Sequence, residues 1–457
     1  MSLTPVIPRG TRSLGPCIPW LFEVLDCAAP QRPPRAHPLA GVSEVLLGRG
    51  EDVGRDGSTL RIGVPDRWMS ESHARLRRLG DQWQLEDLGT TNGTRIGGQR
   101  AEKRELADGD ALEMGGTFFL FRAALPSGTF RPPQCVPGVH LAHIHPDLAT
   151  MSRALAEDFG RLPAIARSAV PVVLAGETGT GKEVVARAVH QLSGRAGRFV
   201  AVNCAAIAPT LLASELFGHR KGAFSGALEN RPGLVRAADC GTLLLDEVAE
   251  LSPEAQGALL RFLQEGEIRA VGATDAARVD VRVIAASHVD LEEAVAAGTF
   301  RADLLARLSG FTLCLPPLRG RREDLGLLVA ALLRRHGGAR ATLTAGAGRA
   351  LMRYRWPLNV RELEQCLAAA LALAGGHAIE PLHMPLAVVR PPPPVQAFAG
   401  LQPRPLAPED AARREELVAL LRDHRGNVAA VARALGKARM QVHRWVKRFQ
   451  LTLADYR

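Results

Sequence analysis

The sequence predicts a multidomain protein with an N-terminal β-sandwich, a central α/β domain and a C-terminal helical domain. Three observations support this prediction. At 457 residues the chain is too long for one ordinary hydrophobic core. Proline-rich stretches interrupt it at 126–137 and 391–408. The segments between these breaks also differ in their hydrophobic periodicity. Apolar and polar residues alternate in the first segment. The second mixes continuous apolar runs with apolar residues at helical spacing, and the third is helical and basic.

Bulk composition narrows the class of protein. A hydrophobic content of 46% excludes a mostly disordered chain, and a net charge of +10 favours a polyanionic partner such as nucleic acid. The seven cysteines follow neither a zinc-binding nor a disulfide pattern, which suits a reducing compartment. Since no apolar run has the length of a membrane span, we expect a cytoplasmic protein without a membrane partner.

The first domain is expected at 20–124, between a flexible tail at 1–19 and a linker at 125–139. Apolar and polar residues alternate there in short runs, such as Leu60, Ile62 and Val64, and turns rich in Gly and Asp separate the runs. A period of two residues indicates half-buried strands, so this segment predicts an all-β sandwich.

The second domain is expected at 140–386, followed by a proline-rich linker at 387–408. Four apolar runs, at 172–174, 199–202, 243–245 and 281–284, predict buried parallel strands. After the first run, Val185, Ala188, Val189 and Leu192 recur at helical spacing. Strands that alternate with helices predict an α/β architecture.

A glycine-rich segment joins the first of these strands to the helix. Its residues are Gly176, Glu177, Thr178, Gly179, Thr180, Gly181, Lys182 and Glu183. Glycines let backbone N–H groups approach phosphate oxygens, the helix N-terminus adds positive potential, and Lys182 neutralises the outer phosphates. The alternative is a tight strand-to-helix turn without a ligand. Glu183 stands where a Ser or Thr would bind magnesium.

Polar residues follow the other predicted strands. Asn203, the pair Asp246 and Glu247, and the pair Ser287 and His288 each come directly after an apolar run. Ligands of open parallel sheets bind at the carboxyl ends of strands. We therefore expect ATP and Mg²⁺ as ligands, with Asp246 holding the metal and Glu247 activating water. An Asp-Glu pair alone is more often a helix cap.

One further segment resembles the signature loop of the sigma-54-dependent transcription activators. It consists of Gly222, Ala223, Phe224, Ser225, Gly226 and Ala227. From the residues alone, glycines around Phe224 allow a sharp turn that either exposes or buries the ring. The resemblance implies that this loop contacts sigma-54 RNA polymerase. Ser225 replaces the usual Thr, which retains the hydroxyl group and loses a methyl group.

The resemblance extends over 140–386 and implies an AAA+ ATPase with a helical lid, which forms a ring, usually hexameric, with ATP bound between subunits. It includes Glu183, so the missing hydroxyl is a family trait. It implies that Asn203 holds the catalytic Glu, that Arg301 and Arg307 reach a neighbouring subunit's ATP, and that Arg361 lies near the γ-phosphate. Taken singly, each arginine fits a solvated helix face equally well.

The first domain resembles a forkhead-associated (FHA) domain. The matching residues are Gly48, Arg49, Ser70, His73, Thr91, Asn92, Gly93, Thr94, Leu106, Asp108, Gly109 and Asp110. The resemblance implies that Arg49, Ser70, Thr91 and Asn92 bind a phosphothreonine protein or a Ser/Thr kinase. Glu71 opposes this interpretation, since a carboxylate repels phosphate. We expect His73 to be a structural hydrogen-bonding residue.

The third domain, at 409–457, predicts a helix-turn-helix. Val428, Val431, Ala432 and Leu435 share one helix face, and Gly436 ends that helix. Apolar positions of a second helix follow, and the segment resembles a Fis-type DNA-binding domain. The residues expected at enhancer DNA are Arg439, Gln441, His443, Arg444, Lys447 and Arg448. Leu417, Leu420 and Leu421 are expected to pair two subunits around a two-fold axis. A solvated basic helix is the alternative.

Together these patterns predict an ATP-hydrolysing regulator that remodels sigma-54 polymerase under the control of its FHA domain. A second hypothesis is a phosphopeptide-binding adaptor tethered to DNA, whose ATPase is slow or idle. A third is an AAA+ machine that acts on DNA or protein, but this hypothesis leaves the Phe224 loop unexplained.

Overall fold

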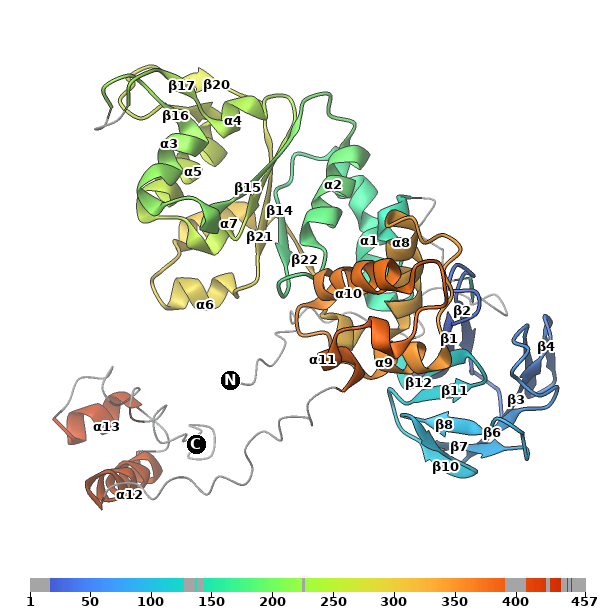
Figure 1. Ribbon diagram of the computed structural model, residues 1–457. Coiled ribbons are helices and arrows are strands. Elements are labelled where there is room, and N and C mark those ends of the chain that lie inside the picture. Colours follow the sequence, from blue (N-terminus) through green and yellow to red (C-terminus); the bar gives the residue numbers. More distant parts are fainter. Residues whose placement is uncertain are drawn as a thin grey trace. The chain divides into compact units, whose positions relative to one another are not determined.

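The computed structural model describes residues 17–126, 136–137, 144–223, 227–390, 408–424, 428–436, 442 and 445. The chain divides into two compact units, Met1–Pro391 and Pro392–Arg457. The first unit contains the β-sandwich and the α/β domain, and the second contains the C-terminal helices (Figure 1). Among the described residues, no helix combines the length and the apolar character needed to cross a bilayer.

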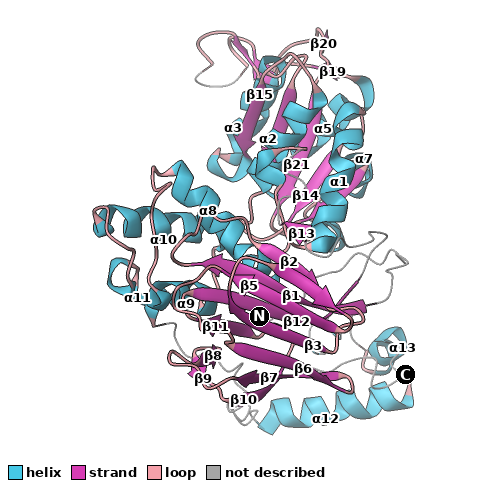
Figure 2. Ribbon diagram, turned by 90° about the vertical axis from the view of Figure 1, so that its right-hand side faces the viewer, coloured by secondary structure: helices cyan, strands magenta, loops and turns pink. Residues whose placement is uncertain are grey.

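The predicted sandwich is confirmed (Figure 2). In the described residues, one sheet has the strand order β13 (Val136–Pro137), β2 (Arg35–Pro38), β1 (Cys17–Asp26), β12 (Thr117–Pro126), β11 (Ala111–Met114), β8 (Thr94–Ile96) and β9 (Gln99–Arg100). The other has the order β10 (Lys103–Leu106), β7 (Gln82–Asp87), β6 (Ala74–Leu79), β3 (Glu44–Arg49), β5 (Thr59–Val64) and β4 (Val53–Asp56). Strand β1 begins inside the expected tail, so residues 17–19 belong to the sheet.

The α/β prediction is also confirmed. Five parallel strands stand in the order β15 (Phe199–Asn203), β18 (Thr242–Asp246), β21 (Arg282–Ser287), β14 (Val172–Ala175) and β22 (Phe311–Cys314). Helices α1 (Arg153–Arg167) and α2 (Lys182–Ser193) cover one face of this sheet. Helices α3 (Pro209–Phe217), α5 (Pro253–Glu265) and α7 (Ala302–Leu308) cover the other face (Figure 1). Two shorter helices, α4 (Leu234–Ala237) and α6 (Leu291–Ala296), lie in the same domain.

A small hairpin carries the loop that resembles the sigma-54 signature. Strands β16 (Gly218–His219) and β17 (Arg231–Pro232) pair antiparallel and close the loop at its base. The backbone N–H of Arg220 donates to the carbonyl of Val271, beside a second hairpin formed by β19 (Glu267–Ile268) and β20 (Ala277–Arg278). Phe224, Ser225 and Gly226 lie outside the described residues, so the expected contact loop is described only at its two ends.

A helical lid follows the last strand of the sheet. It begins with two short 3-10 segments, η4 (Leu318–Gly320) and η5 (Arg322–Asp324). Helices α8 (Leu325–Arg335), α9 (Ala345–Arg353), α10 (Asn359–Ala374) and α11 (Leu386–Val389) come next. Their apolar faces surround Trp356, which is 2% exposed and donates its indole N–H to the carbonyl of Leu351 at 3.1 Å. The lid helices therefore pack around Trp356, in an apolar cluster that they share with β1 and β12.

The C-terminal unit contains α12 (Pro408–Asp423) and α13 (Val428–Ala434). Gly436 adopts a φ of 61° after α13, as expected of a helix-ending glycine. Leu417 and Leu421 are buried against Val431 within this unit. The expected pairing of two subunits through Leu417, Leu420 and Leu421 remains a prediction.

Candidate phosphate-binding and FHA sites

The glycine-rich loop lies between β14 and α2, as the sequence predicts. Gly176, Gly179 and Gly181 have φ angles of 152°, 78° and 103°, which residues other than glycine rarely adopt. Gly181 is the N-cap of α2 and supplies no side-chain cap. The first N–H groups of a helix that no side chain satisfies form a site for an anion, so the loop fits a phosphate group.

The lid contacts this loop at Gly179. A Cβ atom on Gly179 would lie 2.2 Å from the carbonyl oxygen of Leu358, so only glycine fits this approach. The backbone N–H of Val360 donates to the carbonyl of Gly179 at 2.9 Å. The first turn of α10 is thereby placed against the loop, and Arg361 lies in that turn.

Lys182 is the cation of the site. Its side chain is 7% exposed, and its ammonium group donates to the carbonyl of Gly176 at 2.8 Å. The pKa of Lys182 lies below its usual value, mainly because the side chain is buried. The charges of Glu247 and Asp246 oppose this shift, and the charge of Arg361 adds to it. Asp246, Glu247 and Arg361 each act electrostatically on Lys182, so the structure brings both carboxylates and the lid arginine near the predicted cation.

The two carboxylates lie at the end of β18. Burial, and then the charge of Glu247, raise the pKa of Asp246 above its usual value. Glu247 has a φ of 55°, which is costly for a non-glycine residue and typical of functional positions. A divalent cation would relieve the repulsion between the two carboxylates, and carboxylate oxygens are its preferred ligands. The arrangement therefore fits Mg²⁺ at Asp246.

Asn203 lies beside Asp246 at the ends of their paired strands, one residue from Glu247, and its expected contact with Glu247 remains a prediction. Its side-chain oxygen accepts from the backbone N–H groups of Ala205 at 2.9 Å and of Ala206 at 3.2 Å, where it caps a short 3-10 helix. Glu247 interacts with the ring of His288. His288 was predicted as a polar strand end, and the structure adds its contact with the carboxylate.

Three more predicted side chains lie outside this group. Arg301, the N-cap residue of α7, is 51% exposed and pairs with Asp303 at 2.6 Å, and Arg307 is exposed within α7. Neither is among the charges that act on Lys182. Glu183 pairs with Arg187 one turn along α2, at 2.6 Å. The three side chains therefore remain accessible at the surface of this chain.

Sequence reasoning missed Asn359, which joins the loop to the lid. This side chain is fully buried. Its oxygen accepts from the N–H of Leu318 at 2.8 Å, and its amide group donates to the carbonyl of Thr178 at 3.0 Å and to the carboxylate of Glu177 at 3.2 Å. Asn359 directly follows Leu358 in the matched motif, but only the fold shows what it touches.

Two arginines from the start of the lid reinforce this junction. Arg319 forms two hydrogen bonds to the carboxylate of Glu177, at 2.7 and 2.5 Å. Arg321 is 6% exposed and donates to the carbonyl of Thr180 at 2.7 Å. The lid therefore holds the phosphate loop through side chains as well as through α10.

Replacing Asn359 by aspartate is expected to raise the KM for ATP about tenfold, since each lost hydrogen bond from a buried group costs about 1–2 kcal/mol. Aspartate tolerates the left-handed backbone of this position and retains the acceptor for Leu318. The substitution removes the two hydrogen bonds that the amide group donates to Thr178 and Glu177, and it places a second carboxylate beside Glu177. Glu364→Gln on the same helix is the control, and an unchanged KM in a folded Asn359→Asp protein would exclude the role.

The expected phosphopeptide residues lie on three loops of the sandwich. The N–H of Arg49, at the end of β3, donates to the carbonyl of Ser70 at 2.8 Å. Asn92, on the loop after β7, donates to the carbonyl of Trp68 at 2.8 Å. Arg49, Thr91 and Asn92 are exposed and Ser70 is half-buried, so the side chains are available to a ligand.

Buried residues hold these loops in place. A Cβ atom on Gly48 would lie 1.8 Å from the carbonyl of Glu71, which explains the glycine before Arg49. His73 is fully buried and accepts from the N–H of Ser70 at 3.1 Å. Burial lowers its pKa. The structural role predicted for His73 is confirmed.

The residues expected at DNA are not described by the structure. Arg439, Gln441, His443, Arg444, Lys447 and Arg448 all lie outside the described residues. Of the predicted second helix, only Val442 and Trp445 are described, and both are helical. Val442 is buried against the helices that precede it.

The parallel sheet, its phosphate loop and the lid that contacts the loop define an AAA+ P-loop domain. Comparison with known families agrees along the chain. A family model for the FHA domain matches 48–115, and one for the sigma-54 interaction domain matches 148–314. A model for the AAA+ ATPase lid domain matches 319–397, and one for a homeodomain-like domain matches 408–453.

Several transcription regulators are similar to this chain. The anaerobic nitric oxide reductase transcription regulator NorR of Salmonella newport is 43% identical over 339 residues, which are 71% of this chain and 65% of that protein. The Nif-specific regulatory protein of Bradyrhizobium diazoefficiens is 51% identical over 232 residues, 50% of this chain and 40% of that protein. The hydrogenase transcriptional regulatory protein HoxA of Cupriavidus necator is 46% identical over 302 residues, 63% and 62% of the two chains.

The chain thus spans about two thirds or less of the length of these relatives. With its four domains in this order and these relatives, it belongs to the sigma-54-dependent transcription regulators.

Proposed function

We propose that this protein hydrolyses ATP to remodel sigma-54 RNA polymerase at a promoter, while its C-terminal domain holds it on enhancer DNA. The observation that carries the proposal is the grouping of Lys182, Asp246, Glu247 and Arg361 around the phosphate loop of a sigma-54 interaction domain. The identities of these side chains match the needs of phosphoryl transfer to water.

Each side chain has a role in this proposal. Lys182 and the N–H groups of α2 bind the phosphates, and Arg361 adds positive charge from the lid. Asp246 would hold Mg²⁺, which neutralises charge that develops on the phosphates. Glu247 orients the attacking water and accepts its proton, with His288 holding the carboxylate in place.

The promoter-opening test uses the ring of Phe224. With purified protein, sigma-54 polymerase and a promoter that the polymerase alone leaves closed, ATP is expected to produce open complexes. Phe224→Ala is expected to retain ATP hydrolysis and to lose promoter opening. Leu228, four residues further on, is 78% exposed, so Leu228→Ala is a matched control. Normal opening by the Phe224 variant would overturn the contact role.

The same assay separates this proposal from the adaptor alternative. Lys182→Ala removes the buried cation of the phosphate loop and is expected to abolish both hydrolysis and promoter opening. Arg187→Ala changes an exposed residue of the same helix and is expected to preserve both. A Lys182 variant that still activates transcription would favour an adaptor with an idle ATPase.

We also propose that the FHA domain binds phosphothreonine through Arg49, Ser70, Thr91 and Asn92. Arg49→Ala is expected to weaken binding of a phosphothreonine peptide by about tenfold or more, because a hydrogen bond to a charged group contributes about 1.5–3 kcal/mol. Titration with phosphorylated and plain peptides measures this loss. Arg61→Ala, on the exposed side of β5, is the control. Equal affinities of the wild-type protein for both peptides would contradict phosphate recognition.

A further inference from the structure

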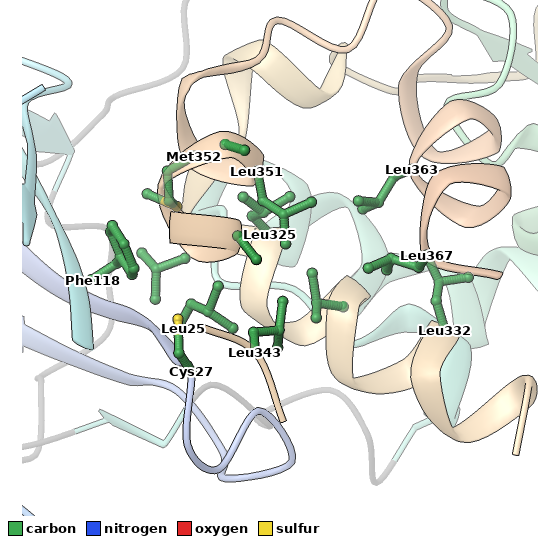
Figure 3. Close-up of a cluster of buried hydrophobic side chains, with 14 of the residues drawn as sticks. Leu25, Cys27, Phe118, Leu325, Leu332, Leu343, Leu351, Met352, Leu363 and Leu367 are labelled. Carbon is green, nitrogen blue, oxygen red and sulfur yellow. The ribbon is translucent and has the colours of Figure 1, made fainter. Parts of the chain in front are cut away.

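One outer face of the sandwich is buried. If apolar and polar residues alternated along its strands as usual, this face would be polar and exposed to solvent. In β12, Phe119 and Phe121 point into the sandwich core, whereas Phe118 and Leu120 point away from it. Both outward residues are at most 2% exposed, because they belong to one apolar cluster with the lid. A strand with two buried faces lies between two layers. The lid is the second layer (Figure 3).

Two glycines bring the lid helices into close contact with the sandwich. A Cβ atom on Gly326, in α8, would lie 1.7 Å from the carbonyl oxygen of Val24 in β1. One on Gly348, in α9, would lie 2.5 Å from the sulfur of Cys27 and 2.5 Å from the ring of Phe118. Glycine weakens a helix, so its presence at both contact points indicates a fitted interface.

Hydrogen bonds and ion pairs surround this apolar contact. Arg349 of α9 forms two hydrogen bonds to the carboxylate of Glu113, at 2.7 and 2.5 Å. The backbone N–H of Leu343 donates to the carbonyl of Cys27 at 2.7 Å. Figure 3 shows Leu25, Cys27 and Phe118 facing the lid residues Leu325 and Leu343 across the cluster.

The segment that starts the lid contacts both the FHA domain and the phosphate loop. Arg322 donates to the carbonyl of Gly109 in the sandwich at 3.0 Å. Glu323 is 3% exposed and pairs with Arg122 of β12 at 3.3 Å, and its burial raises its pKa to about 7. Arg321, which precedes Arg322 in this segment, donates to the carbonyl of Thr180 in the phosphate loop at 2.7 Å.

The same interface reaches the loops expected to bind a peptide. Asp66, in the loop before Ser70, accepts from the N–H of Trp68 at 2.8 Å. Its second oxygen accepts from the N–H of Gly116 at 2.7 Å and from the hydroxyl of Thr117 at 3.0 Å, where β12 begins. Phe118, which contacts the lid, is the next residue of β12.

We propose that the FHA domain is a fixed partner of the ATPase lid and sets the position of the lid at the phosphate loop. Occupancy of the FHA loops and occupancy of the nucleotide site then influence each other through β12 and the segment 321–323. This coupling rests on the proposed ATPase function. The two sites are joined by a path of buried and partly buried contacts, and coupling between sites is reciprocal.

The experiment uses the full-length chain and the Glu113–Arg349 pair. Arg349→Ala and Glu113→Ala are each expected to raise the Kd for a fluorescent ATP analogue by about fivefold or more. The doubly reversed protein, with Glu113→Arg and Arg349→Glu, is expected to recover most of the affinity. The Glu44–Arg77 pair lies on the other sheet, at 3.0 Å, and its alanine variants are matched controls with unchanged Kd.

Hydrogen exchange provides a second readout. Addition of ADP to the wild-type chain is expected to change amide protection at 65–72 and 88–93, and the single interface variants are expected to lose this response. A folded interface variant with wild-type Kd and an unchanged exchange response would overturn the proposal. Since ATP hydrolysis by the wild-type protein is measured independently, that outcome leaves the proposed ATPase function intact.

Discussion

Replacing Arg301 or Arg307 by alanine is expected to lower ATP turnover by about 10³-fold or more. Arg301 is the N-cap residue of α7 and Arg307 lies in its last turn, and neither is among the charges that act on Lys182 of the same chain. We therefore expect them to act on ATP bound by a neighbouring subunit. An arginine that stabilises charge in the transition state from a second subunit makes turnover depend on assembly.

The rate of ATP hydrolysis per subunit should accordingly increase with protein concentration, because assembly is required for activity. Mixing tests the shared site directly. The Arg301 variant retains Glu247, and a Glu247 variant retains Arg301, so mixed assemblies contain some complete sites. We expect activity to return when the two inactive proteins are combined. Arg261→Ala, an exposed arginine on α5, is the control for surface charge. Failure to recover activity in assembled mixtures would contradict a site shared between subunits.

Replacing Glu247 by glutamine is expected to lower the rate of ATP hydrolysis by about 10²–10⁴-fold, the range for loss of a general base. Glutamine keeps the size of the side chain and its contact with His288, but it cannot accept a proton from water. Removal of one of the two carboxylates also relieves the repulsion on Asp246. We therefore expect nucleotide binding to be unchanged or tighter.

Single-turnover hydrolysis and equilibrium binding of the same ATP analogue separate these two effects. Glu250→Gln is a matched control, because Glu250 is exposed on the short helix that follows Glu247. A Glu247 variant that hydrolyses ATP at the wild-type rate would remove Glu247 from the mechanism. A proportional loss of binding and hydrolysis would instead indicate a role in holding nucleotide.

Local patterns in the sequence were sufficient for much of the fold. Alternation predicted β5, because a strand's side-chain period shows which faces are buried. Apolar runs predicted four strands of the parallel sheet, β14, β15, β18 and β21, and missed β22. The phosphate loop was also predicted from local sequence. Its glycines, its lysine and its place between a strand and a helix are adjacent in the chain, so no distant contact is needed to recognise them.

The contacts of Asn359 and Asn203 were beyond such reasoning. Asn359 is 182 positions from Glu177 in the chain, and its amide group meets that carboxylate only because the lid folds back on the loop. Asn203 and Glu247 both follow strands, and the resemblance implied contact between them. In the structure the oxygen of Asn203 also caps a short 3-10 helix, which the pattern of strand ends did not indicate.

The sequence by itself determined the order of the domains, the phosphate loop and the acidic end of β18, because each depends on residues close together in the chain. Tertiary structure decided what covers the sandwich. Four consecutive apolar residues, Phe118 to Phe121, indicate a strand buried on both faces. Only the packing shows that α8 and α9 form the second layer, since burial of an apolar face does not specify which surface covers it.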